Sequence, residues 1–167
     1  MFKKMLFLLV FVNYYFIAAE NLAPKLAKGA ALSAFSLLNA HSYYTNTKKG
    51  LNAKRLLVGV GLFTAMVVGA VAGEELEVSR VIPICYGISG LAACAWAGAK
   101  GVKDVIWESE NKKVDDGLQT VFRAGIFGNF NFYSSFGLSG VAWFLQKKDN
   151  KLSSILKSLS TKIIKRN

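Results

Sequence analysis

The sequence predicts an all-α fold: a multi-pass transmembrane bundle of four or five apolar helices, followed by a C-terminal amphipathic basic helix. Three observations lead to this prediction. Two long uncharged runs adjoin each other, charged residues are segregated from such runs throughout the chain, and small residues recur at helical spacing inside them. At 167 residues, the chain is expected to form a single domain.

The two central runs, residues 56–73 and 81–99, contain no charged side chain and are 18 and 19 residues long. As α-helices they would be about 27 to 29 Å long, close to the thickness of the hydrocarbon core of a bilayer. The link between them is short and rich in glutamate. The sequence therefore predicts a transmembrane helical hairpin over residues 56–99.

The segregation of charge extends this prediction to the rest of the chain. All 21 basic and 10 acidic residues fall outside five uncharged stretches, whereas a soluble domain would place its charges along amphipathic elements. The stretches are residues 5–19, 29–47, 56–73, 81–99 and 124–146. We therefore expect residues 20–146 to form a transmembrane helical domain, in the plasma membrane, or in the inner membrane if the source is bacterial.

The two chain ends have separate predicted roles. Residues 1–19 have a basic start and a 15-residue apolar region, which is typical of a secretory signal peptide or an uncleaved signal anchor, and both alternatives stay open. Residues 147–167 place Leu and Ile at helical spacing between basic side chains, which predicts an amphipathic helix on anionic lipid headgroups. The predicted lipid-surface residues are Lys151, Lys157, Lys162, Lys165 and Arg166.

Two of the predicted spans carry polar residues that leave their geometry open. Residues 29–47 would insert only marginally alone, so they either pack against the next helix or lie at the interface. Residues 124–146 alternate polar and aromatic side chains, which suits either a full span or a broken, re-entrant one. Between residues 100 and 123 we expect a short amphipathic surface helix and a turn at Asp115-Asp116-Gly117.

Small residues repeat along the two central runs. On helices they form smooth stripes along which a second backbone can approach closely, so we expect the two stripes to face each other in a tight pair. The predicted packing residues are Gly61, Ala65, Gly69 and Gly73 in the first run, and Gly90, Cys94 and Gly98 in the second.

Three polar residues inside the uncharged runs are candidate sites. His41 is the only histidine of the chain, and its ordinary role would be a hydrogen-bonded interfacial residue rather than a proton relay or ligand. Asn129 and Asn131 either line a polar path or hydrogen-bond across helices, and the second role is favoured. Cys85 and Cys94 would lie on opposite faces of one helix, where they cannot form a disulfide with each other.

The sequence contains no phosphate-binding loop, no metal-ligand spacing of His and Cys, and no nucleophile elbow. We therefore expect a non-enzymatic membrane scaffold or accessory subunit without cofactor or metal. The net charge is +11, and most basic residues flank apolar runs, which indicates anionic lipid rather than nucleic acid as the partner. A second copy of the chain or another membrane protein is a further expected partner. The alternatives are a small pore-forming or transport protein, holin-like or channel-like in layout, and a membrane-bound enzyme acting near His41, which is disfavoured.

Overall fold

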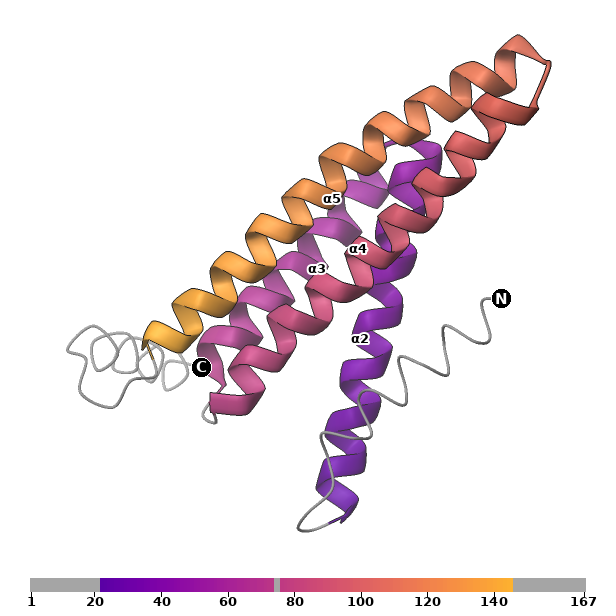
Figure 1. Cartoon of the computed structure of the whole chain (residues 1–167). Coiled ribbons are helices and arrows are strands. Elements are labelled where there is room, and N and C mark those ends of the chain that lie inside the picture. The colour runs from indigo at the N-terminus through magenta and orange to yellow at the C-terminus, as the bar shows by residue number, and fades with distance from the viewer. Residues whose placement is uncertain (1–21, 74–75, 146–167) are drawn as a thin grey trace.

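A computed structural model of the chain describes residues 22–73 and 76–145, which form four helices and contain no strand (Figure 1). The helices are α2 (Leu22–Lys49), α3 (Ala53–Ala72), α4 (Leu76–Trp107) and α5 (Asn111–Leu145). The predicted all-α fold is confirmed for this part of the chain. The predicted signal segment and the basic tail lie outside the described residues.

The α2–α3 connection is a tight turn whose backbone groups are satisfied locally. Gly50 has φ 75° and its N–H donates to the Asn46 carbonyl at 3.0 Å, a left-handed helix end that favours glycine. Asn52 caps α3 because its Oδ1 accepts the Arg55 backbone N–H at 2.9 Å. The Arg55 guanidinium donates to the carbonyls of Lys49 and Gly50, which α2 itself leaves free.

Helices α4 and α5 extend well beyond the uncharged runs, and this corrects one sequence prediction. The turn between them lies at residues 108–110, and Asp115, Asp116 and Gly117 are helical, so the predicted turn at these residues is wrong. The physical reason is packing. Gly117 lies against Gly101 of α4, and this long-range contact outweighs the local turn preference of the Asp-Asp-Gly sequence.

Helix α5 is continuous from Asn111 to Leu145, so the alternative of a broken, re-entrant segment in residues 124–146 is wrong as far as residue 145. The alternating Asn and aromatic residues do not interrupt the helix. The Asn131 side chain donates to a carbonyl of α4 instead of competing with its own helical backbone.

Helices α4 and α5 form an antiparallel hairpin whose backbones approach closely at glycines. A Cβ atom added to Gly101 would lie 2.8 Å from the Gly117 carbonyl oxygen, and one added to Gly117 would lie 2.8 Å from the Gly101 carbonyl oxygen. Farther along the hairpin, a Cβ on Gly98 would lie 3.1 Å from the Cβ of Ala124. Only residues without a side chain allow this separation, which brings backbone Cα–H groups close to carbonyls.

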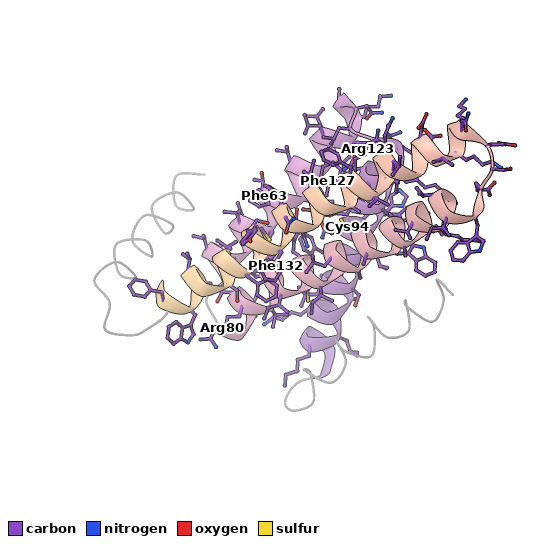
Figure 2. All side chains as sticks on the ribbon, turned by 45° about the horizontal axis from the view of Figure 1, so that its top comes forward. Phe63, Arg80, Cys94, Arg123, Phe127 and Phe132 are labelled. Carbon is purple, nitrogen blue, oxygen red and sulfur yellow. The ribbon has the colours of Figure 1, made fainter. Side chains whose placement is uncertain are left out.

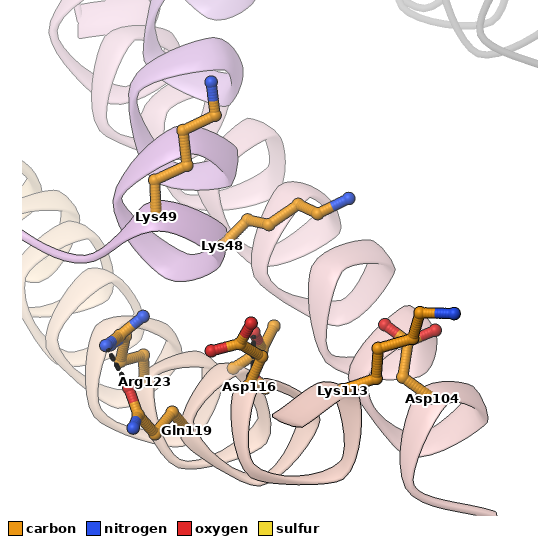
Figure 3. A pocket seen from close by; sticks show the side chains of 8 residues that line it. Lys48, Lys49, Asp104, Lys113, Asp116, Gln119 and Arg123 are labelled. Carbon is orange, nitrogen blue, oxygen red and sulfur yellow. Dashed lines mark hydrogen bonds between the residues drawn. The ribbon is translucent and has the colours of Figure 1, made fainter. Parts of the chain in front are cut away.

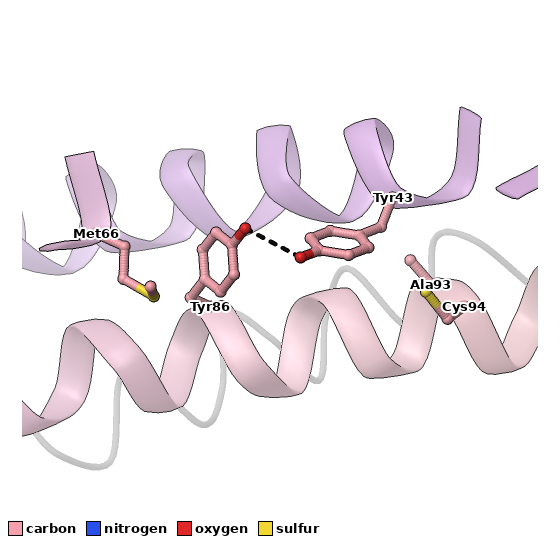
Figure 4. Packing of buried hydrophobic residues seen from close by; sticks show 5 residues of the cluster. All are labelled: Tyr43, Met66, Tyr86, Ala93 and Cys94. Carbon is pink, nitrogen blue, oxygen red and sulfur yellow. Dashed lines mark hydrogen bonds between the residues drawn. The ribbon is translucent and has the colours of Figure 1, made fainter. Parts of the chain in front are cut away.

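Helix α4 is the centre of the bundle, since it packs against α2, α3 and α5 (Figures 1 and 2). The Tyr86 ring of α4 lies 5.9 Å from the ring of Tyr43 on α2 and 6.2 Å from that of Phe63 on α3. Met66 of α3 is fully buried in the same cluster (Figure 4). Tyr86 therefore joins three helices.

We expect Gly101→Ala to lower the stability of the bundle by about 1 to 3 kcal/mol, because the added methyl group meets a backbone carbonyl that cannot move alone. Gly61→Ala is the matched control, since nothing described lies within 4 Å of its Cβ position. Thermal unfolding in detergent, followed by helical circular dichroism, measures both. Equal melting temperatures would contradict the close approach of α4 and α5.

Candidate functional site: an uncharged band around a polar interior

The uncharged stretches of α4 and α5 lie side by side. Gly98 faces Ala124 near one end of the stretches, and Gly87 faces Ser135 near the other. Because these pairs share one antiparallel register, residues 81–98 of α4 lie beside residues 124–141 of α5, which are also uncharged.

Helices α2 and α3 continue the same band around α4. Gly69 of α3 lies against Ile82 of α4, and Asn39 of α2 hydrogen-bonds to Tyr86 of α4. These contacts place the uncharged parts of α2 and α3 beside that of α4. We refer to this common region, which extends along α4 from Val81 to Ala99, as the uncharged band.

Basic and aromatic side chains meet at both ends of the uncharged band. At one end, the Arg80 guanidinium lies 6.0 Å from the Trp143 ring centre. At the other, the Lys100 ammonium lies 5.5 Å from the Trp96 ring centre and 5.7 Å from that of Tyr44. We name these the Arg80 end and the Lys100 end. Arg80 and Lys100 are 20 positions apart, which is a rise of about 30 Å in a helix and one hydrocarbon thickness. Such aromatic–basic pairs are typical of membrane interfaces.

The outer surface of the uncharged band is predominantly apolar. Two helices, Ala53–Ala72 and Val78–Trp107, are long and apolar enough to cross a membrane, which by itself is weak evidence for membrane association. Only 11% of the apolar window of α3 is buried, unlike the core helix of a soluble protein. Its exposed large residues are Leu56, Leu57, Val58, Val60, Val68 and Val71.

The interior of the bundle is polar. More polar than apolar residues are fully shielded among the described residues, which reverses the usual arrangement of a water-soluble protein. The buried polar residues are Ser36, Asn39, Ser42, Asn46, Thr47, Ser79, Ser89, Thr120, Asn131 and Ser135. None of them carries a charge, so no ion has to be desolvated to form this interior.

The Asn39 amide of α2 connects two helices at the middle of the uncharged band. Its Nδ2 donates to the Tyr86 carbonyl and to the Ser89 hydroxyl of α4, both at 3.0 Å. The hydroxyls of Tyr43 and Tyr86 are 3.1 Å apart, one helical turn farther along α2. These hydrogen bonds satisfy polar groups that would find no water to bond to in an apolar environment.

The Asn131 amide of α5 makes the corresponding connection on another side of α4. Its Nδ2 donates to the Gly87 carbonyl at 2.7 Å, and the Asn131 backbone carbonyl accepts the Ser135 hydroxyl. A Cβ on Gly90 would lie 2.6 Å from Asn131 Oδ1, so only glycine leaves room for this amide.

Several polar atoms of this interior have no hydrogen-bond partner. They are Ser36 Oγ, Asn39 Oδ1, Asn46 Oδ1 and Asn131 Oδ1. Three of the four belong to α2 and lie on its buried face, which also carries Ser42. Buried acceptors of this kind are usually satisfied by ordered water.

The structure pairs the predicted small-residue stripes differently from the sequence prediction. Gly90 and Gly98 face α5 rather than α3, and Cys94 lies between Gly128 of α5 and Thr47 of α2. Of the first stripe, only Gly69 and Gly73 meet α4, at Ile82 and Ser79. Ala65 is exposed and Gly61 has open space beside its Cβ position within the described bundle. The reason is that α5 supplies the polar and small side chains that fit against the glycines of α4.

The candidate polar residues separate into inward and outward positions. Asn131 is buried in the α4–α5 contact, whereas His41 and Asn129 are exposed. Sequence analysis missed Asn39 and Tyr86, the residues that join the helices. The signal was present, since polar residues at 36, 39, 42, 43, 46 and 47 share one face of a helix.

A polar crevice lies at the Lys100 end, between the end of α2 and the α4–α5 hairpin (Figure 3). It is lined by Lys48, Lys49, Asp104, Lys113, Asp116, Gln119, Thr120 and Arg123. Hydrogen bonds to Glu108 and Glu110 raise the pKa of Lys113 at the exposed hairpin tip. The described residues contain no group of three or more His, Cys, Asp or Glu that could hold a metal ion.

We expect Asn131→Leu to destabilise the bundle by about 1 to 2 kcal/mol, because it removes the hydrogen bond to the Gly87 carbonyl and places a branched aliphatic side chain against Gly90. Asn129→Leu is the matched control on the same helix, and it should leave the melting temperature of the detergent-dispersed protein within about 2 °C of the original, as for ordinary surface changes. A similar loss in both variants would contradict the inward role of Asn131.

Comparison with protein-family models, with curated proteins and with solved structures found no match for this chain. The contacts, burial and charge of the described bundle are therefore the basis on which a function can be proposed.

Proposed function

We propose that this chain is a small multi-pass integral membrane protein that acts as a non-enzymatic scaffold or accessory subunit. One observation carries the proposal: the uncharged stretches of four helices lie in register and form a band that is apolar outside and polar inside. This arrangement suits surrounding lipid, because lipid solvates the outer side chains and leaves polar groups to pair within the bundle.

The polar composition of α2 and α5 is consistent with spanning helices. Neither α2 nor α5 is identified as a membrane span by its length and composition alone. Many of their amides and hydroxyls, such as those of Asn39, Ser42 and Asn131, face the interior, so insertion of the assembled bundle does not expose these groups to lipid. These two helices would enter as partners of α3 and α4 rather than as independent spans.

Exposure of the outer face of α3 to water would be energetically unfavourable compared with its exposure to lipid. Its outer face carries six large aliphatic side chains that are about half exposed or more. Leaving a Val or Leu side chain in water rather than in an apolar environment costs about 1.5 to 3 kcal/mol for full exposure. Lipid removes that cost without requiring any protein to cover the face.

A non-enzymatic role follows from the chemistry of the interior. Within the described part of the uncharged band, buried polar groups are amides, hydroxyls and one thiol, and no carboxylate or imidazole is buried among them. General acid–base catalysis therefore has few candidates there. We propose lipid as the surrounding partner, with anionic headgroups near the basic C-terminal residues and with another copy or membrane protein against the outer helix faces.

Transport of a small polar solute is the second candidate function. The observation that favours it is the α2 face with unpartnered atoms at Ser36, Asn39 and Asn46. Solute flux through reconstituted vesicles tests this candidate. Flux that disappears in Asn39→Leu but persists in Leu38→Ala, a neighbour that is 60% exposed, would favour transport over the scaffold role.

Labelling of single cysteines in sealed vesicles tests the membrane proposal. Ala27→Cys and Ser109→Cys, exposed at the Arg80 end and the Lys100 end, should react with a charged maleimide from opposite sides. Val60→Cys, in the middle of the band, should stay unlabelled although Val60 is 53% exposed. The unsubstituted protein, which contains only Cys85 and Cys94, measures the background labelling of these two thiols. Rapid labelling of Val60→Cys before detergent is added would contradict the proposed membrane location.

A further inference from the structure

The polar crevice at the Lys100 end has an excess of positive charge (Figure 3). Four of its lining residues are cations and two are carboxylates, so the lining carries a net charge of +2. Its volume of about 400 Å³ lies within the range of about 300 to 1,000 Å³ that is typical of small-molecule sites. The crevice is therefore large enough and basic enough for a small anionic group.

The two lysines that α2 contributes to the crevice are available to bind an anion. Lys48 and Lys49 lie in the last turn of α2, are exposed, and make no ion pair with any residue that the structure describes. Lys113 differs, because its Nζ lies 3.1 Å from Glu108 Oε2 and 3.4 Å from Glu110 Oε2. The two α2 ammonium groups therefore keep their charge and their N–H donors for a ligand.

Arg123 of α5 is held at the edge of the crevice by contacts that leave most of its donors free. A Cβ on Gly50 would lie 3.3 Å from Arg123 Cζ, so the guanidinium lies against the α2–α3 turn. Its Nη2 donates to Gln119 Oε1 at 2.6 Å, a bond that orients the guanidinium without neutralising it. The other N–H groups of the guanidinium make no hydrogen bond within the described residues and can donate to two oxygens of one phosphate.

The two carboxylates of the crevice reduce the attraction for an anion without removing it. Asp104 interacts electrostatically with Lys113, so its charge is partly neutralised there. Asp116 makes no ion pair within the part of the chain that the structure describes, and it opposes an anion. It is outnumbered by Lys48, Lys49 and Arg123, which decide the sign of the local charge.

The depth of the crevice matches that of lipid phosphates. Lys100 marks one end of the uncharged band, and Asp104 in the crevice wall follows four residues later, about 6 Å farther along α4. The headgroup region outside the hydrocarbon core is about 5 to 8 Å thick on each side of a bilayer. A band that spans the hydrocarbon core therefore opens the crevice at the level of the headgroups.

We propose that the polar crevice binds the phosphate group of an anionic lipid, and that Lys48, Lys49 and Arg123 bind its oxygens. The inference rests on the proposed membrane location, which brings lipid phosphates within reach of these residues. An anionic headgroup is favoured over a choline headgroup, because the ammonium of choline is repelled by the same cations. This site is separate from the basic residues 147–167, for which the sequence also predicts lipid contact.

Lysine footprinting in lipid nanodiscs tests the site residue by residue. An amine-acetylating reagent modifies accessible lysines, and mass spectrometry of the peptides measures the extent at each position. Phosphatidylglycerol added to phosphatidylcholine nanodiscs should reduce acetylation of Lys48 and Lys49 severalfold, because a bound phosphate covers their ammonium groups. Lys103 and Lys112 are the matched controls, since both are exposed at the same end but do not line the crevice, so their acetylation should change little.

Three variants test the assigned residues. Arg123→Gln, and separately Lys48→Gln, should each weaken the phosphatidylglycerol effect at Lys49 by about fivefold, since each removes one positive charge near the lipid surface. Lys48 is exposed, so its replacement leaves the packing of the bundle intact. Asp116→Asn should strengthen the effect, because it removes the opposing charge. Lys112→Gln removes a charge outside the crevice and should leave the effect unchanged.

Two further measurements separate the ligand from its alternatives and the site from the membrane proposal. Alkaline carbonate extraction of the membranes first establishes whether the protein is embedded. Glycerol phosphate, added in solution to phosphatidylcholine nanodiscs, then tests a soluble source of the same phosphate chemistry. It should protect Lys48 and Lys49 far less than phosphatidylglycerol does, because a soluble ligand is not held at the membrane surface.

Each of four results would overturn the inference. Equal protection of the crevice lysines and the control lysines would show diffuse attraction of the whole basic surface. An embedded protein without protection of Lys48 and Lys49 would exclude the site but leave the membrane location intact. Protection by glycerol phosphate as strong as that by phosphatidylglycerol would assign the crevice to a soluble phosphate compound. Extraction of the protein by carbonate would remove the membrane proposal itself, and with it the lipid ligand.

Discussion

The packing of polar groups against the backbone of α4 is the interaction on which the rest of the bundle depends. Between Tyr86 and Gly90, α4 offers two carbonyls to side-chain amides, one from α2 and one from α5. Glycine makes this possible, because a side chain on Gly90 would occupy the space of the Asn131 amide. Hydrogen bonds therefore join three helices at one level, beside the cluster in which Tyr86 packs against Tyr43, Phe63 and Met66.

This central contact explains why the bundle has its apolar surface outside. Because amides and hydroxyls occupy much of the interior, only some apolar residues of α3 and α5, such as Met66 and Leu138, pack in the core cluster. The other large apolar residues of these helices form the outer surface, between Arg80 with Trp143 at one end and Lys100 with Trp96 at the other. Polar interior and apolar exterior are thus two consequences of the same helix packing, and both suit a lipid environment.

The helical class and the number of uncharged segments could be predicted from sequence, because charge segregation and helical periodicity are local properties of the chain. The turn near Asp115 could not. Its residues favour a turn locally, but Gly117 meets Gly101 only when α4 and α5 are already paired. Likewise, small-residue stripes indicate close packing without naming the partner, so the preference of Gly90 and Gly98 for α5 over α3 was not readable from spacing.

The sequence by itself determined which segments are uncharged, that those between residues 29 and 145 are helical, and which residues are small enough for close contact. These properties depend on composition and on the repeat of a single helix. Only the tertiary structure decided which polar residues are interior and which face outward, as Asn131 and Asn129 illustrate two positions apart. That choice depends on the rotation of each helix about its axis, which long-range contacts with α4 fix and which local sequence leaves free.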